Sequence, residues 1–232
     1  MSTTGRPTRR YVSPRRQQSA AQTRQAVLDA ARALFVHQGY VATTIEQIAD
    51  GAGVSKPTVF ASVGNKRAII KQLRDLAIAG DDQPVALAER PWFKQALDDP
   101  DPRRSLRLHA RNIVRLHQSA ADLAEVLRSG AGADQELREL WQTAEDERRV
   151  DAGTIIDALL RNGPLKAGLD REGAVDILWI LASADNFQRL VRARAWSLQR
   201  YEQWLAQTLL DQLLPPNHQH PQEARAPRWS AP

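Results

Sequence analysis

The 232-residue sequence contains no cysteine, which excludes disulfide bonds, thiolate catalysis and metal centres built on cysteine ligands. It also lacks any run of about 18 apolar residues, so no segment is expected to cross a membrane as a helix. The arginine-rich N-terminus is not followed by the apolar stretch of a signal peptide. Together these absences predict a cytoplasmic protein.

Runs of alternating apolar and polar residues are also missing, so we expect no β-sheet. Helical periodicity is present instead: apolar residues between 26 and 35 recur with a period near 3.6, and Gly39 supplies a stop. Further helices are expected at 66–79, 102–117, 119–128, 134–161, 171–194 (which a break near Ser183 would divide) and 197–214. Residues 80–101 are predicted to be a loop with one helical turn near Trp92–Leu97. The predicted fold class is all-α.

The charge of the chain is unevenly distributed. Residues 1–74 hold 12 Lys and Arg against 3 Asp and Glu, whereas the remaining residues hold 20 against 24. A basic front on an acidic body suggests that the front meets a polyanion such as nucleic acid. The alternative is a solubilising tail.

Both ends of the chain have the composition of disordered segments. Residues 1–18 carry five arginines, two prolines and no acidic residue, and residues 215–232 contain five prolines. We therefore expect a basic arm at 1–18 and a proline-rich tail at 215–232, with the folded protein between them.

One stretch carries the strongest functional signal. Thr44, with Gln47 three residues later, has the spacing of a capping box at the start of a helix. Gly53 suits a tight turn that needs a positive φ. Ser55 can then cap a second helix, and Pro57 fits the first turn of that helix because its missing N–H is not needed there.

Two short helices joined by a tight turn must cross closely. Ala49 is small enough for that crossing, and Ile48, Val54 and Val59 would form its apolar wedge. This is the arrangement of a helix-turn-helix, whose second helix enters the major groove of DNA. The alternative is an ordinary helical hairpin inside a bundle.

From Thr23 to Ile70 the sequence "TRQAVLDAARALFVHQGYVATTIEQIADGAGVSKPTVFASVGNKRAII" resembles the DNA-binding domain of TetR-family transcriptional regulators. The resemblance implies a three-helix DNA-binding domain, here 19–66, that contains the helix-turn-helix. It also implies a C-terminal helical bundle, here 67–214, that dimerises and often binds a small effector.

The resemblance carries over to single residues. In the family, the cap and first turn of the recognition helix contact phosphates and base edges, and the lysine matched by Lys66 contacts a phosphate. Phe60 keeps the ring of the usual tyrosine but loses its hydroxyl, while Ser62 and Val63 also depart from the family pattern. The residues expected to contact DNA are Thr43, Thr44, Ser55, Lys56, Pro57, Thr58, Phe60 and Lys66.

The basic arm offers a second set of contacts. Flexible arginines can enter an adjacent minor groove or gather phosphates. The candidates are Arg6, Arg9, Arg10, Arg15 and Arg16. The alternative is a tail without ordered contacts.

Dimerisation is expected through the last two long helices, as the resemblance implies. Residues 197–214 present a wide apolar stripe that includes Tyr201, Trp204, Leu205, Leu209 and Leu213. A stripe this wide needs more than one neighbour. Ordinary packing within one subunit is the alternative.

An effector pocket is predicted on the helix at 134–161, where Trp141, Arg148 and Asp151 lie along its inward face. Arg148 and Asp151 interrupt an apolar stripe, as polar groups in a ligand pocket do. They equally suit a structural ion pair. His109 and His117 lack a carboxylate partner at ligand spacing, so neither a metal nor a cofactor is expected.

The sequence therefore predicts a repressor that binds a palindromic operator as a homodimer and is released by a small molecule. The alternative is a DNA-binding protein of the same fold with an architectural or protein-partner role and no effector. An enzyme is not expected, because the sequence has no nucleophile elbow, P-loop, zinc-protease helix or paired acid and base. The stretch "SGAGAD" at 129–134 lacks the third glycine of a dinucleotide fingerprint and reads as a loop.

Overall fold

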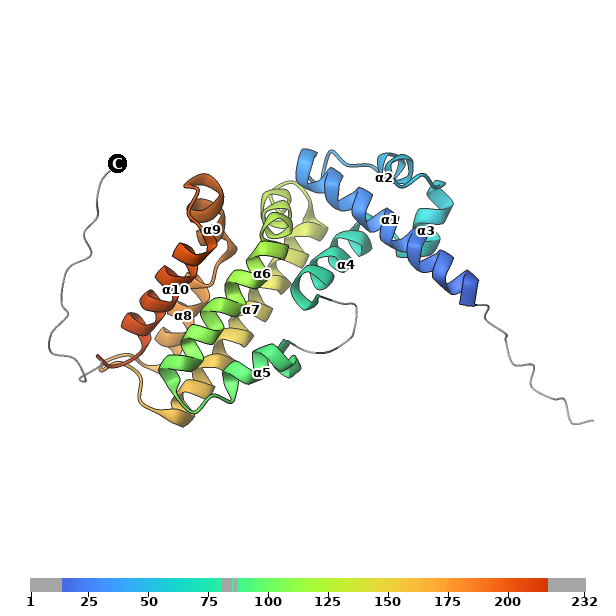
Figure 1. Cartoon of the computed structure of the whole chain (residues 1–232). Coiled ribbons are helices and arrows are strands. Elements are labelled where there is room, and N and C mark those ends of the chain that lie inside the picture. Colours follow the sequence, from blue (N-terminus) through green and yellow to red (C-terminus); the bar gives the residue numbers. More distant parts are fainter. Residues whose placement is uncertain (1–13, 81–84, 86, 217–232) are drawn as a thin grey trace, which may run out of the picture. The chain divides into compact units, whose positions relative to one another are not determined.

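The computed structural model describes residues 14–80, 85 and 87–216, and their regular elements are all helices (Figure 1). These ranges hold no strand, which confirms the predicted all-α class. Within the same ranges, no helix combines the length and the apolar character that crossing a membrane requires.

The chain divides into two compact units: Met1–Gln83 with Ser119–Ala144 form the first, and Pro84–Gln118 with Glu145–Pro232 form the second. Two long helices, α6 (Pro102–Gly130) and α7 (Gln135–Asn162), contribute residues to both units. The boundary expected at 66–67 differs from this division, because the helix that begins there belongs to the first unit.

The first unit is organised around its N-terminal helix. Its other helices are short, and α1 contacts α2, α3 and α4. Their bounds are α1 Pro14–Gln38, α2 Ile45–Ala52, α3 Lys56–Val63 and α4 Lys66–Ala79.

A single apolar core holds this unit together. It combines side chains of α1 to α4 with side chains from the parts of α6 and α7 that belong to the unit. Burying one large aliphatic or aromatic side chain contributes about 1.5–3 kcal/mol. The fully buried members include Leu28, Phe35, Ile48, Val59, Ile69, Ile70, Leu123 and Leu137.

Helix α1 begins earlier than the sequence predicted. It starts at Pro14, so residues 14–18, which were expected to belong to the arm, are helical. Proline is well suited to the first position of a helix, and the Arg, Gln and Ala residues that follow are good helix formers. Local propensity therefore extends the helix into the basic segment.

The second unit contains shorter helices beside its parts of α6 and α7. The 3₁₀ turn η1 spans Leu87–Glu89, followed by α5 Pro91–Leu97, α8 Arg171–Leu181, α9 Ala184–Phe187, the π-helix η2 Gln188–Ala193 and α10 Leu198–Leu213. Its core is built on large buried side chains from most of these elements: Phe93, Leu106, Ile156, Leu178, Phe187, Tyr201, Leu205 and Leu209.

Two expectations for this part of the chain are decided by the structure. The division into helices 102–117 and 119–128 is wrong, because α6 continues through Gln118 and Ser119. Neither glycine nor proline stands at that joint to end the helix. The break near Ser183 is confirmed: α8 ends at Leu181, and Ser183 caps α9 by accepting a bond from the Asp185 N–H.

Candidate nucleic-acid interface

The turn between α2 and α3 depends on Gly53. This residue has φ 66° and ψ 32°, and its N–H donates back to the carbonyls of Ala49 and Asp50. A side chain at a positive φ would be strained, so glycine is the favoured residue there. The prediction of a tight turn at this glycine is confirmed.

The start of α2 carries a complete capping box. The Thr44 hydroxyl accepts a bond from the Gln47 N–H at 3.2 Å, and the Gln47 side chain accepts one from the Thr44 N–H at 2.9 Å. Both donors would otherwise lack a partner within the helix. The predicted cap is therefore confirmed, and exposed Thr44 is held at the front of α2.

The start of α3 is arranged in a similar way. The Ser55 hydroxyl accepts a bond from the Thr58 N–H at 3.4 Å and lies 2.8 Å from the Thr58 hydroxyl. Pro57 sits in the first turn, where no intrahelical acceptor is available for an N–H. The predicted cap and the predicted place of the proline are both confirmed.

Helix α3 has one buried and one exposed face. Val59 and Val63 are buried in the core of the first unit, whereas Lys56, Pro57 and Phe60 are exposed. Phe60 stands out because 52% of its surface is accessible. A short helix that presents a cation, a proline ring and an aromatic ring outward has the groups that base edges and thymine methyls contact.

Lys56 has a partner that the sequence analysis did not identify. Its Nζ donates to Oε1 of Glu46 on α2, and this bond lowers the pKa of the Glu46 carboxyl. Both side chains are about half exposed, at 51% and 53%, so solvent weakens the pair. Glu46 is one of only three acidic residues among the first 74, which is the signal that could have drawn attention to it.

Lys66 anchors the loop before α2. Its Nζ donates to the carbonyls of Tyr40 at 3.0 Å and Thr43 at 2.9 Å, and it lies 4.2 Å from the centre of the Tyr40 ring. Partial burial lowers the pKa of this lysine. Because an ammonium group has three N–H donors, one remains for another acceptor such as a phosphate.

The two neighbouring threonines differ in accessibility. Thr43 is 1% exposed, and its hydroxyl donates to the Gly39 carbonyl at 2.8 Å, whereas Thr44 is exposed. Of the arm candidates, Arg15 is exposed on α1. Arg6, Arg9 and Arg10 lie outside the described residues, as does the side chain of Arg16.

The three residues predicted for an effector pocket are not gathered in one unit. Trp141 packs against the core of the first unit, while Arg148 and half-buried Asp151 belong to the second. Arg148 binds the Glu145 carboxylate at 2.6 and 2.8 Å and donates to the Trp179 carbonyl at 2.7 Å. The part of the chain that the structure describes has no cluster of three or more metal-binding side chains.

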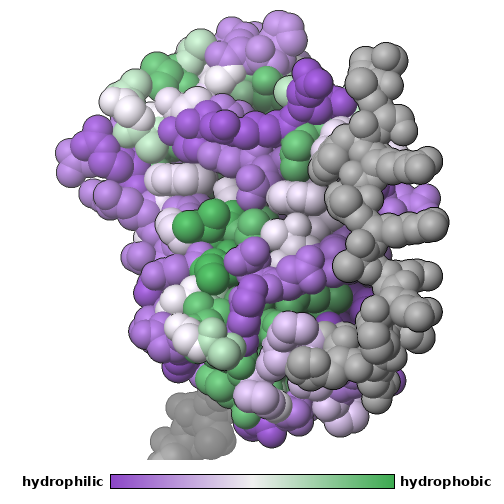
Figure 2. Space-filling model, turned by 90° about the vertical axis from the view of Figure 1, so that its left-hand side faces the viewer, coloured by the Kyte–Doolittle hydropathy of each residue, from purple (hydrophilic) through white to green (hydrophobic). Residues whose placement is uncertain are grey.

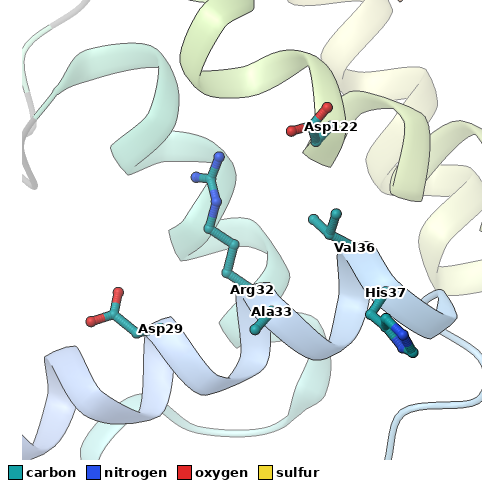
Figure 3. A pocket seen from close by; sticks show the side chains of 6 residues that line it. All are labelled: Asp29, Arg32, Ala33, Val36, His37 and Asp122. Atoms are coloured by element: carbon teal, nitrogen blue, oxygen red, sulfur yellow. The ribbon is translucent and has the colours of Figure 1, made fainter. Parts of the chain in front are cut away.

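The first unit has an open cavity of about 400 Å³ that the sequence analysis missed (Figure 3). Asp29, Arg32, Ala33, Val36 and His37 of α1 line it together with Asp122 of α6. Arg32 also donates to the Ser119 carbonyl at 2.8 Å. The polar residues that line the cavity are spread along α1 and on α6, with Asp29 and His37 well apart in Figure 3, and they form no motif that the sequence would reveal.

The apolar stripe expected on the last helix is covered within its own unit. Tyr201, Leu205 and Leu209 are each fully buried. Hydrophobic patches nevertheless interrupt the hydrophilic surface on the side of the molecule turned toward the viewer in Figure 2. The exposed large hydrophobic residues of this unit include Ile180 at 57% and Leu198 at 37%.

Residues 27–73 match the family described as bacterial regulatory proteins, tetR family. The uncharacterized HTH-type transcriptional regulator YdeS of Bacillus subtilis strain 168 is 30% identical over 162 residues, covering 68% of this chain and 74% of YdeS. A second uncharacterized HTH-type regulator of that strain, YvkB, is 43% identical over 51 residues, covering 22% and 27%.

Solved structures share the fold. The crystal structure of NalD, the secondary repressor of the MexAB-OprM multidrug efflux pump in Pseudomonas aeruginosa, has a TM-score of 0.64 at 22% identity, covering 85% of this chain and 98% of NalD. A SmeT–triclosan complex has a TM-score of 0.62 at 18% identity, covering 83% and 91%. At these identities the likeness concerns the fold alone.

Proposed function

Because this chain belongs to the TetR family of helix-turn-helix transcriptional regulators, which are not enzymes, we propose that it is a repressor released from DNA by a small effector. In this proposal the repressor binds a palindromic operator as a homodimer. The observation that carries it is the exposed front of α3, where polar and aromatic groups lie outside a buried valine face.

Base readout is assigned to the first turn of α3. Lys56 can donate to guanine O6 and N7 after exchanging its bond to Glu46, and Pro57 can contact a thymine methyl. Thr58 and Phe60 extend this surface. Because Phe60 lacks a hydroxyl, its contribution to DNA binding is contact with apolar atoms rather than a bond to phosphate.

Phosphate contacts are assigned to residues around the first turn of α3. Thr44 and Ser55 lie at the starts of α2 and α3, where helix N-termini favour anions. Lys66 keeps one donor for a phosphate while it holds the preceding loop. The arginines of the N-terminal segment would add further contacts in the minor groove or along the backbone.

A homodimer explains how two such surfaces would meet a palindrome. A twofold axis presents two α3 helices to two half-sites about one helical turn apart. The exposed Ile180 and Leu198 lie on α8 and α10, the helices expected to form the interface. Light scattering that finds only 26 kDa monomers at micromolar concentration contradicts this part of the proposal.

Release by an effector draws support from two structural relatives. NalD is described as a repressor, and the SmeT structure is a complex with triclosan. We assign the effector to the second unit, where Arg148 and Asp151 bring polar groups into a helical bundle. The predicted role of Trp141 in this pocket has no counterpart in the second unit, since Trp141 packs in the first.

The decisive experiment maps the DNA that the protein protects, starting with its own upstream region, and then compares Lys56→Ala with Lys71→Ala. Lys71 is a matched control because it is an exposed lysine paired with Asp75 on α4. Lys56→Ala should weaken specific binding by about 1–3 kcal/mol and relax discrimination at one position. Lys71→Ala should bind normally.

The same measurements separate the alternatives. Uniform weakening on every sequence would make Lys56 a phosphate contact instead of a base reader. Equal binding by the two variants would contradict the assignment of α3 as the recognition helix. Many scattered sites without changes in expression would favour an architectural role.

A further inference from the structure

A continuous run of aromatic rings lies inside the second unit. The ring centres of His117 and Phe187 are 5.6 Å apart, those of Phe187 and Tyr201 are 5.5 Å apart, and those of Tyr201 and Trp204 are 5.6 Å apart. These residues come from α6, α9 and α10. Offset and edge-to-face contacts of this kind provide large flat surfaces in a packed interior.

Leaving arginine side chains aside, four polar side-chain atoms in the interior of this unit have no hydrogen-bond partner among the described residues. They are Nε2 of His109, which packs against Phe93, and Nδ1 of His117, Oη of Tyr201 and Nε1 of Trp179. His117 is 9% exposed and Tyr201 is fully buried. Buried polar atoms are nearly always bonded because desolvating them without a partner is costly, so four in one unit call for an explanation.

The chemistry of each atom is defined. Burial and the charge of Arg148 lower the pKa of His117 to about 3, so its ring is neutral. A hydrogen bond with the backbone of Ala182 favours the protonated form, which makes the Ala182 carbonyl the acceptor and Nε2 the donor. Nδ1 is then an acceptor. Burial raises the pKa of Tyr201, so its hydroxyl keeps its proton, and the Trp179 N–H is a donor.

Arg148 connects Trp179 to this group. Its guanidinium lies 5.8 Å from the centre of the Trp179 ring and donates to the Trp179 carbonyl. Its charge is already matched by the Glu145 carboxylate. A cation entering here would meet the guanidinium, and an anion would compete with Glu145, so the surroundings favour an uncharged molecule.

The chain beside these rings is irregular. The helix is interrupted between Leu181 and Ala184, the next segment is the π-helix η2 at Gln188–Ala193, and Ala195 has φ 54°. A π-helical turn and a positive φ at a residue other than glycine both occur disproportionately at functional sites. This irregular segment joins α9 to α10 and therefore lies between two of the elements that carry the rings.

We propose that His117, Trp179, Tyr201 and the adjoining rings bind an uncharged aromatic molecule that carries a hydroxyl group. The hydroxyl donates to Nδ1 of His117, and its oxygen accepts from Tyr201 or Trp179, while the aromatic body packs against Phe187 and Trp204. Because the rings pack directly against one another in this structure, the segment 182–197 must shift before a molecule can bind between them. This inference rests on the proposed function in one respect: the bound molecule is the effector.

The test uses two isosteric probes and two isosteric variants of the full-length protein. The probes are 2-naphthol, which carries the hydroxyl, and 2-methylnaphthalene, which does not. Binding is measured by thermal shift and by quenching of tryptophan fluorescence. The variants are Tyr201→Phe and, as a control in the first unit, Tyr40→Phe. Tyr40 is also buried, but its side-chain oxygen is not among the buried atoms without a partner.

For the wild type we expect 2-naphthol to bind at least about tenfold more tightly than 2-methylnaphthalene, since only the former can satisfy the buried groups. Tyr201→Phe should weaken 2-naphthol binding by about 5- to 10-fold while leaving thermal stability unchanged or raised. Tyr40→Phe should bind both probes normally. His117→Leu should remove the preference for 2-naphthol over 2-methylnaphthalene. Its thermal stability should also be unchanged or raised.

Equal binding of the two probes, or equal binding of 2-naphthol by the wild type and Tyr201→Phe, overturns the inference whatever the DNA experiments show. Selective 2-naphthol binding that is lost in Tyr201→Phe supports the site. If that binding does not release operator DNA, the effector role fails while the site stands. If the protein protects no operator at all, the proposed function fails independently, because probe binding is measured without DNA.

Discussion

The front of the first unit and the interior of the second unit treat polar groups in opposite ways. At the front, Thr44, Ser55 and Lys66 each hold a backbone group or loop in place through identified hydrogen bonds. In the interior, His117 and Tyr201 keep buried polar atoms without a partner among the described residues. The hydrogen bonds at the front are therefore already made in the free protein, whereas the interior of the second unit has unused hydrogen-bonding capacity, which the proposed ligand would use.

This difference has a physical reason. A DNA-reading surface must hold its helices at a fixed angle, so local caps and a glycine turn are used to define the backbone. A site for a small molecule gains selectivity from buried groups that are satisfied only when the correct molecule is present. In the first region the caps and the glycine turn stabilise the backbone, whereas in the second the buried polar groups would determine which molecule binds.

The largest expected effect comes from a matched pair of phenylalanines, one in each region. Phe187→Ala removes a side chain that is 1% exposed and should lower the free energy of unfolding by about 3–5 kcal/mol. Phe60→Ala removes one that is 52% exposed and should change it by less than about 0.5 kcal/mol. Urea unfolding of the full chain measures both.

For operator binding we expect the opposite order, with a larger effect of Phe60→Ala than of Phe187→Ala in the folded protein. Phe60→Ala is expected to weaken operator binding because the ring lies on the exposed face of α3. A large loss of stability in Phe60→Ala would show that its ring is part of a packed interior, and the distinction between the two regions would then be broken.

The pH dependence of stability sharpens the same comparison. Burial lowers the pKa of His109 to about 4 and the pKa of His117 to about 3, whereas the ordinary pKa of histidine is 6.5. As the pH falls below 6.5, the unfolded chain takes up protons that the folded protein refuses, so stability falls with decreasing pH. Between pH 7 and pH 5 each histidine should lower the free energy of unfolding by about 2 kcal/mol.

The measurement is urea unfolding at a series of pH values. His109→Leu and His117→Leu should each remove one histidine's contribution to the loss of unfolding free energy at low pH. The double variant should remove both contributions. A pH profile that is unchanged in the double variant would show that neither imidazole is buried in its neutral form.

The regions also differ in how far the sequence predicts them. The helix starts at Thr44 and Ser55 and the turn at Gly53 were predicted from neighbouring residues, because caps and turns are set by interactions within about four positions. The partner of Lys56 was missed, since Glu46 lies ten positions away on another helix. Long-range pairing of exposed charges leaves no periodic signal in a single sequence.

In the second unit, the sequence placed the helices well but not the residues that meet inside it. Arg148 was predicted to face an interior, yet its partners Glu145 and Trp179 and its neighbour His117 were not identified. Helical periodicity shows which face of a helix is buried but not which other helix covers it. The π-helix also has no local signature in the sequence, because it depends on packing across several elements.

A smaller effect is expected at the cap of α2. Thr44→Ala removes the acceptor for the Gln47 N–H and should lower stability by about 1 kcal/mol. Thr44→Asp restores a capping side chain, so stability should recover, but under the proposed function its negative charge would face the DNA. Operator binding should remain weakened in Thr44→Asp. Recovery of both properties would show that Thr44 is a structural cap without a role at the DNA surface.

The smallest effect on folding is expected at Glu46. Glu46→Gln removes the charge that holds Lys56, and both side chains are about half exposed, so thermal stability should be almost unchanged. Since Lys56 would then approach DNA without first leaving a carboxylate, non-specific affinity should rise by a few-fold. Gel-shift titrations against random duplex at several salt concentrations measure this. Asp75→Asn, which removes the carboxylate that pairs with Lys71 and Arg74 on α4, is the matched control and should leave binding unchanged. An equal rise in both variants would attribute the gain to net charge alone, and the Lys56–Glu46 pair would then have no particular part in setting specificity.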